Sequence, residues 1–206
     1  MKPGPVLKLS KQDEVNRDVI KSLDTTGIPI HPLIRYTSRN RCSGGYMKSL
    51  VVYYSLTGKT RLVSQTVAEA LNATLVEIKE AKPRRPGLLT YLTGGIAAIT
   101  NKGSKINPID VDLKQHERIF IGSPVWASRP SPAINSFIYK TDFECRSVIP
   151  FFTMGGDNAE KALANIMAKI ERSHGKVVGS CAVTSDKVSD EEITARAKDA
   201  VKGYSR

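Results

Sequence analysis

The sequence is poor in cysteine and contains no long apolar segment. Its three cysteines, Cys42, Cys145 and Cys181, are far apart and show no CxxC spacing. This argues against a disulfide framework and a zinc site, and it predicts reduced thiols, with Cys181 buried. No apolar run reaches the roughly 18 residues that a membrane-spanning helix needs, and no signal-peptide pattern is present. We therefore expect a cytoplasmic protein without a spanning segment and without a metal site.

Negative charge is scarce relative to positive charge. The 206 residues include 31 Lys and Arg but only 20 Asp and Glu, which gives a formal net charge of +11. The basic residues form only two loose clusters, near 35–41 and 82–85, and no aromatic residues alternate with them. We therefore expect a solvated basic surface and no nucleic-acid binding. With 40% hydrophobic residues, the chain is still apolar enough to form an ordinary globular core.

The first 46 residues differ in composition from the rest of the chain. They are polar, are interrupted by prolines and glycines, and contain the flexible sequence Ser43-Gly44-Gly45 near their end. Met47 follows after Tyr46 and lies shortly before an apolar, β-rich run. We therefore predict a flexible N-terminal extension at 1–46 and one domain at 47–206. A further hypothesis is that Met47 is the natural start of the chain.

From Met47 onward, short β-rich runs alternate with segments of helical periodicity. Continuous apolar runs such as 50–54 are typical of strands buried on both faces. This alternation predicts a parallel sheet with helices on both faces. About 40 residues separate the second and third strands, more than one crossover helix needs, which indicates an insertion. The predicted strands are 50–54, 74–78, 118–122, 148–153 and 176–184, and the predicted helices are 62–71, 133–139, 160–172 and one that begins at a Ser189 cap.

The loop at 55–60 has the composition of a phosphate site. It runs from the first strand into a helix, and open α/β sheets bind ligands at the carboxyl ends of their strands. Ser55, Thr57 and Thr60 offer hydroxyl groups, and the helix start offers backbone N–H groups with positive potential. The end of the loop also resembles a nucleotide P-loop, but Tyr53 replaces the glycine that such a motif requires. NTP hydrolysis is therefore disfavoured, whereas an ordinary hydroxyl-capped helix start remains an alternative.

Two further loops follow the third and fourth predicted strands. The segment 122–130 contains Trp126, the single tryptophan, and is stiffened by prolines. Because loops lie at the surface, we expect Trp126 to present its ring for stacking on a ligand and not to fold into the core. The segment 153–158 contains Gly155 and Gly156, which permit the close approach of a ligand. A simple turn capped by Asp157 is the alternative for this third loop.

The motifs of these three loops together resemble those of the flavodoxin family. The resemblance covers 47–206 and depends on Ser-x-Thr-Gly-x-Thr at 55–60, Ile-Gly-Ser-Pro-Val-Trp-Ala at 121–127 and the adjacent glycines at 155–156. It implies an α/β, flavodoxin-like three-layer sandwich, with a five-stranded parallel sheet of order 2-1-3-4-5 and helices on both faces. It also implies FMN as the cofactor, with the phosphate in the first loop and the ring between the other two. The residues that this resemblance assigns to FMN are Ser55, Leu56, Thr57, Gly58, Lys59 and Thr60 at the phosphate, and Pro124, Val125, Trp126, Ala127, Thr153, Met154, Gly155 and Gly156 at the ring.

Two redox functions are compatible with this resemblance. The first is electron transfer through bound FMN to or from a protein partner, which the basic charge predicts to be acidic. The second is an NAD(P)H-dependent, FMN-containing reductase of quinones or other small acceptors. The insertion favours a small second substrate, whereas the lack of a GxGxxG nicotinamide motif favours the electron carrier. A flavin-free scaffold with the same fold is a third hypothesis. We predict no catalytic side chain, since His116 and His174 lie outside the three loops.

Overall fold

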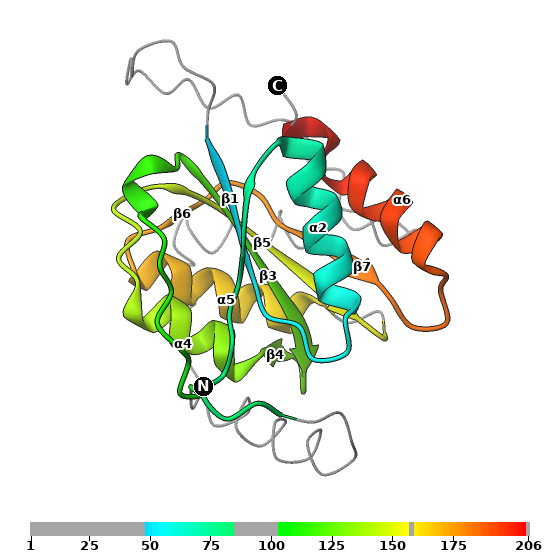
Figure 1. Ribbon diagram of the computed structural model, residues 1–206, viewed down its shortest axis with the longest axis horizontal. Coiled ribbons are helices and arrows are strands. Elements are labelled where there is room, and N and C mark those ends of the chain that lie inside the picture. The colour runs from blue at the N-terminus through cyan, green and yellow to red at the C-terminus, as the bar shows by residue number, and fades with distance from the viewer. Residues whose placement is uncertain (1–47, 85–102, 157–158, 205–206) are drawn as a thin grey trace, which may run out of the picture.

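A three-layer α/β sandwich is formed by residues 48–84, 103–156 and 159–204, the part of the chain that the computed structural model describes (Figure 1). The middle layer is a mostly parallel sheet, and α2 (Lys59–Leu71) and α6 (Asp190–Val201) cover one of its faces. The other face is covered by α4 (Pro132–Lys140) and α5 (Glu160–Arg172). The predicted fold class is therefore confirmed, while the predicted extension at 1–46 lies outside the described residues.

The central sheet has the predicted strand order. Its parallel strands are β1 (Ser49–Tyr53), β2 (Thr74–Glu77), β3 (Arg118–Trp126), β5 (Ser147–Met154), β6 (Lys176–Val177) and β7 (Cys181–Thr184). They run in the order β2-β1-β3-β5, and β6 and β7 both pair with β5 in the fifth place. Because every one of these pairs is parallel, the carboxyl ends of the strands lie at one edge of the sheet.

Side chains of the central strands alternate between two apolar cores, one on each face of the sheet. Leu50 and Val52 of β1 belong to the core under α4 and α5, whereas Val51 belongs to the core under α2 and α6. Ile119 and Phe120 of β3 divide between the two cores in the same way. Every residue of β1 is buried, as expected of a strand that is covered on both faces. The sheet therefore forms a rigid platform for the loops at its carboxyl edge.

The helical periodicity of the sequence locates the helices correctly. The bounds of α5 are the predicted ones, and Ile166 and Ile170 on its inner face are fully buried. The hydroxyl of Ser189 accepts a hydrogen bond from the backbone N–H of Glu192 at 3.2 Å, which confirms the predicted cap of α6. Amphipathic patterns and caps act over one or two turns, so they can be recognised without the rest of the fold.

Two predicted strands differ from the observed ones by more than one residue at a boundary or are interrupted. The third strand continues beyond Gly122 to Trp126, because its last residues pair with β5 and with the short antiparallel strand β4 (Arg129–Pro130). The predicted fifth strand is interrupted at 178–180, so β6 and β7 pair with separate parts of β5. Gly179 lies in this gap, where a Cβ would overlap the hydroxyl of Tyr204 in the C-terminal turn η2 (Lys202–Tyr204). The interruption therefore makes room for the end of the chain.

The two ends of the predicted insertion lie side by side just beyond β2. Glu80 and Ile106 form an isolated antiparallel bridge, and the backbone N–H of Ala81 donates to the carbonyl of Lys105 at 2.8 Å. The insertion therefore leaves and rejoins the domain at one point near the carboxyl edge of the sheet. Its centre, 85–102, lies outside the described residues.

Both cysteines within the described residues are free thiols. Cys145 is exposed, and Cys181 is buried as predicted. Burial raises the pKa of the Cys181 thiol to about 12, so this side chain behaves as a small apolar group. None of the helices in the described part of the chain is long and apolar enough to cross a membrane.

Candidate functional site

The three predicted loops come together at the carboxyl edge of the sheet. The backbone N–H of Tyr54, just after β1, donates to the carbonyl of Gly122 at 3.1 Å. Pro124 of β3 lies in register with Thr153 of β5. The hydroxyl groups of Thr60 and Thr153 are 2.7 Å apart and form a buried hydrogen bond. The first and third segments are therefore in direct contact, although β3 separates β1 from β5.

The first turn of α2 is open towards a ligand. Gly58 occupies its N-cap position with a φ of +94°, a backbone conformation that favours glycine, and no described side chain caps the turn. No described atom lies within 4 Å of the place that a Cβ on Gly58 would occupy. The hydroxyl of Ser55 accepts a hydrogen bond from the Gly58 N–H at 3.1 Å, which fixes the turn before the helix. The remaining N–H groups and the helix dipole form a site suited to an anion, and a phosphate group fits these residues.

The side chains of this first loop differ in their exposure and in their hydrogen-bond partners. Thr57 is exposed, and Leu56 packs against the core under α4 and α5. Thr60 is only 2% exposed, and its hydroxyl is shared with Thr153. The amino group of Lys59 lies 2.8 Å from a carboxylate oxygen of Asp190 on α6, and both side chains are substantially exposed. Lys59 therefore offers its backbone N–H to the loop, while its side-chain charge is directed to α6.

The second predicted loop is a β-hairpin, and its tryptophan lies in the core. Trp126 of β3 pairs with Arg129 of β4, and this pairing directs its ring towards the core under α4 and α5. The ring is only 7% exposed and meets that of Tyr54 edge-on, with 6.0 Å between the ring centres. The prediction of an exposed, stacking Trp126 is therefore wrong. It failed because the sequence showed no sign that the strand continued beyond Gly122.

The exposed tip of this hairpin is the turn Ala127-Ser128. Both residues have positive φ values, 48° and 58°, and this conformation costs roughly 1–3 kcal/mol for a residue with a Cβ. Two-residue hairpin turns usually contain glycine or asparagine for this reason. Four residues of this segment, 124–127, were predicted to contact the FMN ring. Of these, Ala127 is exposed, Pro124 and Val125 are half-buried, and Trp126 is buried. Strain of this kind is common where a loop is held in place for a ligand.

A buried polar cluster beside Trp126 was not predicted from the sequence. The hydroxyl of Tyr54 donates to the carboxylate of Glu80 at 3.1 Å, and the guanidinium of Arg84 pairs with the same carboxylate at 2.9 Å. Arg84 also lies over the Trp126 ring, 5.6 Å from its centre. Burial and the neighbouring Glu80 raise the pKa of Tyr54, so its hydroxyl remains a donor. The four-residue spacing of Glu80 and Arg84 is visible in the sequence, but the position of Arg84 over Trp126 is not.

The third predicted loop begins later than expected. Thr153 and Met154 are buried residues of β5, and Met154 packs in the core under α4 and α5. Gly155 and Gly156 follow the strand and are exposed. The carbonyl of Met154 accepts a hydrogen bond from the backbone N–H of Ser185 at 2.8 Å, which ties this end of β5 to the segment after β7. The exposed part of the loop that the structure describes is therefore the glycine pair, and the alternative cap at 157 lies outside it.

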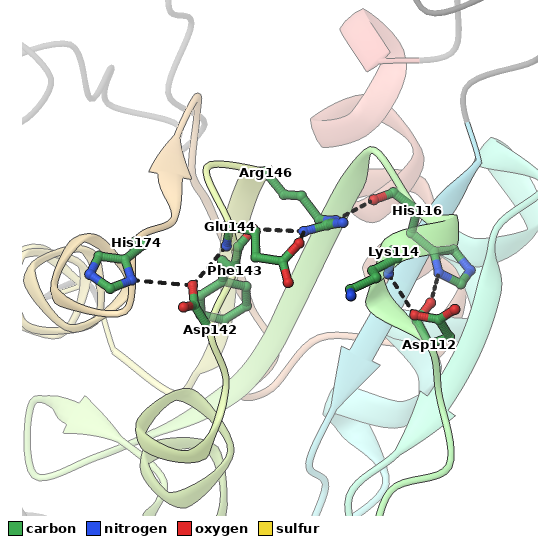
Figure 2. A network of polar contacts seen from close by, with 8 residues as sticks. All are labelled: Asp112, Lys114, His116, Asp142, Phe143, Glu144, Arg146 and His174. Atoms are coloured by element: carbon green, nitrogen blue, oxygen red, sulfur yellow. Dashed lines mark hydrogen bonds and ion pairs between the residues drawn. The ribbon is translucent and has the colours of Figure 1, made fainter.

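The two histidines lie at the opposite edge of the sheet (Figure 2). His116 is buried at the end of η1 (Leu113–Gln115), and its ring nitrogens contact the Asp112 carbonyl at 3.0 Å and the Thr74 hydroxyl at 3.4 Å. His174 is exposed and lies 3.2 Å from a carboxylate oxygen of Asp142. Both histidines precede strands, so the fold keeps them away from the three loops. Within the described ranges, no group of three or more His, Cys, Asp or Glu residues could hold a metal ion.

Comparisons with known proteins agree with this architecture. Residues 48–192 match a family model described as Flavodoxin. A flavoprotein structure from Bacteroides uniformis ATCC 8492 is 25% identical, with a TM-score of 0.61 over 73% of this chain and 97% of that chain. A flavoprotein from Lactobacillus acidophilus NCFM, solved in complex with FMN, is 23% identical, with a TM-score of 0.60 over 66% of this chain and 93% of that chain. No curated protein matches the sequence.

The fold and the site define a doubly wound α/β protein with an open helix start at the carboxyl edge of its sheet. The family model covers well over half of the chain and includes all three site segments. The chain belongs to the flavodoxin family.

Proposed function

We propose that this protein binds FMN and transfers electrons through it to or from a protein partner. The observation that carries the proposal is the open first turn of α2, which presents N–H groups and hydroxyls and contains no acidic residue. Membership of the flavodoxin family supports the proposal. The likeness to the Lactobacillus acidophilus flavoprotein, which was solved with FMN, supports it as well.

In this proposal, the loop at 55–60 binds the FMN phosphate. The Ser55 oxygen already accepts a hydrogen bond from Gly58, so its own proton is free to go to a phosphate oxygen. Thr57 is exposed and can donate in the same way, and Thr60 donates from inside the first turn. Leu56, Gly58 and Lys59 contribute through backbone N–H groups. Neutral donors and a helix dipole hold a phosphate without requiring a cationic side chain.

The ring of FMN occupies, in this proposal, the space between the hairpin tip and the glycine pair. Ala127 and the glycines at 155–156 supply exposed backbone to the ring, with Pro124 and Val125 beside them. Trp126, Thr153 and Met154 support these segments from within the fold. Bound FMN supplies one- or two-electron transfer, while the chain binds it, orients it and limits its contact with water.

One observation favours a second candidate, an NAD(P)H-dependent reductase of quinones or other small acceptors. The exposed residues of the two ring segments, as far as the structure describes them, are Ala127, Gly155 and Gly156, none of which is aromatic. Small side chains leave a bound ring accessible to a small second substrate. The net charge of +11 favours an acidic redox protein as the partner, and this keeps the electron carrier as the first candidate.

The experiment that tests the proposal is a titration of the purified protein with FMN, followed by anaerobic visible spectroscopy. The proposal requires saturable FMN binding that is tighter than riboflavin binding, because the phosphate site contributes only to FMN. Flavin bands that persist after addition of NADPH and NADH, and that bleach on addition of a reduced acidic redox protein, are the expected result. Bleaching by a nicotinamide alone would establish the second candidate. A protein that binds no flavin would overturn both.

We also propose that residues 47–206 form the functional unit and that it acts in the cytoplasm. The family match begins at residue 48, three residues after the last glycine of the hinge. The few, widely spaced cysteines suit a reducing compartment. A chain that begins at Met47 is expected to bind FMN with unchanged affinity, and a loss of binding would show that residues 1–46 contribute to the site.

A further inference from the structure

We propose that Thr153 is a positioning residue of the phosphate site, which holds the Thr60 hydroxyl in place and makes it a donor towards the phosphate. This inference rests on the proposed function. The inference goes beyond the proposed function, because sequence motifs place Thr153 only at the ring. The structure instead joins Thr153 to the loop at 55–60.

The position of Thr153 is fixed by the sheet. Its backbone lies between Pro124 of β3 and Val183 of β7, in register with both. Side chains alternate along β5, so that Phe151 faces α2 and α6 and Phe152 faces α4 and α5. Thr153 therefore points to the α2 side, where its hydroxyl lies 2.7 Å from that of Thr60. The hydroxyl is held by strand pairing on both sides and does not depend on a loop conformation.

The position of Thr60 is fixed as well. Thr60 lies in the first turn of α2, and its carbonyl accepts a hydrogen bond from the Ser64 hydroxyl at 2.7 Å. The side chain is β-branched and has few rotamers in a helix, and the bond to Thr153 favours one of them. Thr60 is 2% exposed and Thr153 is 4% exposed, so water does not replace this bond. The two residues thus form one buried unit that spans from β5 to the helix start.

The direction of this hydrogen bond depends on what lies at the helix start. Each hydroxyl has one proton, and either oxygen can be the donor. A phosphate only accepts hydrogen bonds, so a phosphate at this turn accepts one from the Thr60 hydroxyl. Thr153 must then donate to Thr60. A chain of donors that points from Thr153 through Thr60 to the phosphate strengthens each bond in it.

A purely structural role for Thr153 makes a different prediction. A tie between β5 and α2 that only stabilises the fold affects FMN and riboflavin binding equally, because the two ligands share the ring and differ in the phosphate. A positioning role affects FMN alone. The difference between the two affinities therefore separates the two roles, and thermal unfolding reports any change in the fold itself.

The test compares Thr153→Val, which keeps the shape and removes the hydroxyl, with Thr153→Ser, which keeps the hydroxyl. We expect T153V to weaken FMN binding about three- to tenfold, as the loss of one hydrogen bond in a charged network would. Riboflavin binding should change less than about twofold, because it lacks the phosphate. T153S should bind FMN like the unchanged protein. In a Thr60→Val background, T153V should have no further effect on FMN binding.

Equal losses for both ligands, or no loss for FMN, would overturn the positioning role. If T153V does not fold, Thr153→Ala gives the same comparison, and an equal loss for both ligands there would also overturn it. Failure of the proposed function has a different signature. The unchanged protein would then bind FMN no more tightly than riboflavin, whatever residue occupies position 153.

Discussion

The two edges of the sheet are both polar, but turns at the amino edge are capped by side chains, whereas no described side chain caps the first turn of α2 at the carboxyl edge. At the amino edge, Arg146 donates to the carbonyls of His116 and Phe143, at 3.2 Å each, and to the carboxylate of Glu144 at 3.1 Å (Figure 2). At the carboxyl edge, the first turn of α2 has no described side-chain cap. The difference teaches that an uncapped helix start, and not polar residues alone, distinguishes the candidate binding edge.

Carboxylates at the amino edge cap the backbone N–H groups of its turns. Asp112 accepts a hydrogen bond from the backbone N–H of Lys114 at 2.9 Å and so caps η1. Asp142 accepts one from the backbone N–H of Glu144, also at 2.9 Å. These bonds lower the pKa of both carboxyl groups, because they stabilise the charged form. No carboxylate occupies the equivalent place in the first turn of α2, whose first residues are Lys, Thr and Arg.

The largest expected effect comes from placing a carboxylate beside the uncapped first turn of α2. Thr57→Asp places a negative charge beside the first turn of α2, where it favours the helix dipole and repels a phosphate. We expect FMN affinity to fall about 100-fold, which corresponds to about 2.7 kcal/mol and suits two charges a few ångströms apart near a surface. Thermal stability should rise slightly, since the new charge favours the helix dipole.

The matched control for Thr57→Asp adds the same charge at the other edge. Tyr139 is 89% exposed near the end of α4, so Tyr139→Glu should leave FMN affinity unchanged. Affinity losses of similar size in both variants would mean that net charge, and not the open turn, decides binding.

The next prediction tests whether the polar contacts at the amino edge stabilise the fold. Arg146→Met removes three hydrogen bonds from a side chain that is largely buried. We expect the free energy of unfolding, measured by urea denaturation, to fall by about 2 kcal/mol, with unchanged FMN affinity. Arg196→Met serves as the control, because Arg196 makes an exposed pair with Glu192 on α6, and it should cost less than about 0.5 kcal/mol. A loss of FMN affinity in Arg146→Met would contradict the separation of the two edges.

A smaller effect concerns the ion pair between Lys59 and Asp190. Asp190→Asn releases the Lys59 ammonium at the start of α2 and removes a nearby negative charge. FMN affinity should therefore rise about two- to threefold at low salt, as expected of an exposed pair. The gain should disappear at high salt, where such charges are screened. The neighbouring exposed variant Glu191→Gln is the control, and an equal gain there would assign the effect to overall charge.

The smallest effect is a pH dependence at the amino edge. Hydrogen bonds from the Glu144 N–H and His174 lower the pKa of Asp142 in the folded protein. A lowered pKa stabilises the fold above the ordinary carboxyl pKa of about 3.9, and this contribution is lost as the pH falls through the lower, folded-state value. Asp142→Asn should therefore be less stable than the unchanged protein at pH 7. The two should converge in acid unfolding curves, and a gap that persists at the acid end would count against this assignment.

Much of the fold could be predicted from the sequence, because its signals are local. The apolar run of β1, the helical spacing of α5 and the cap at Ser189 each involve neighbouring residues and appear as predicted. The strand order 2-1-3-4-5 followed from the flavodoxin motifs, since residue patterns alone do not specify which strands pair. The end of β3 was missed because Ser123 and Pro124 resemble loop residues, and only pairing with β5 keeps them in the strand.

The candidate site was predictable as a set of segments and not as a set of contacts. The three segments meet where expected, because the carboxyl ends of parallel strands share one edge. The burial of Trp126 was not predictable, since it depends on the hairpin with β4 and on the edge of the Tyr54 ring. The Glu80–Arg84 pair was missed for a similar reason, because the two ends of the insertion bring it beside Trp126.

The sequence by itself determined which segments become strands and helices and which short motifs end at a helix start. Hydrophobic periodicity, caps and glycine positions act over a few residues, so they need no knowledge of the rest of the chain. Only the tertiary structure decided that Trp126 supports the site from within, and that Thr60 meets Thr153 across 93 positions of sequence. Such contacts depend on strand order and on which face each side chain takes, and the packed sheet sets both.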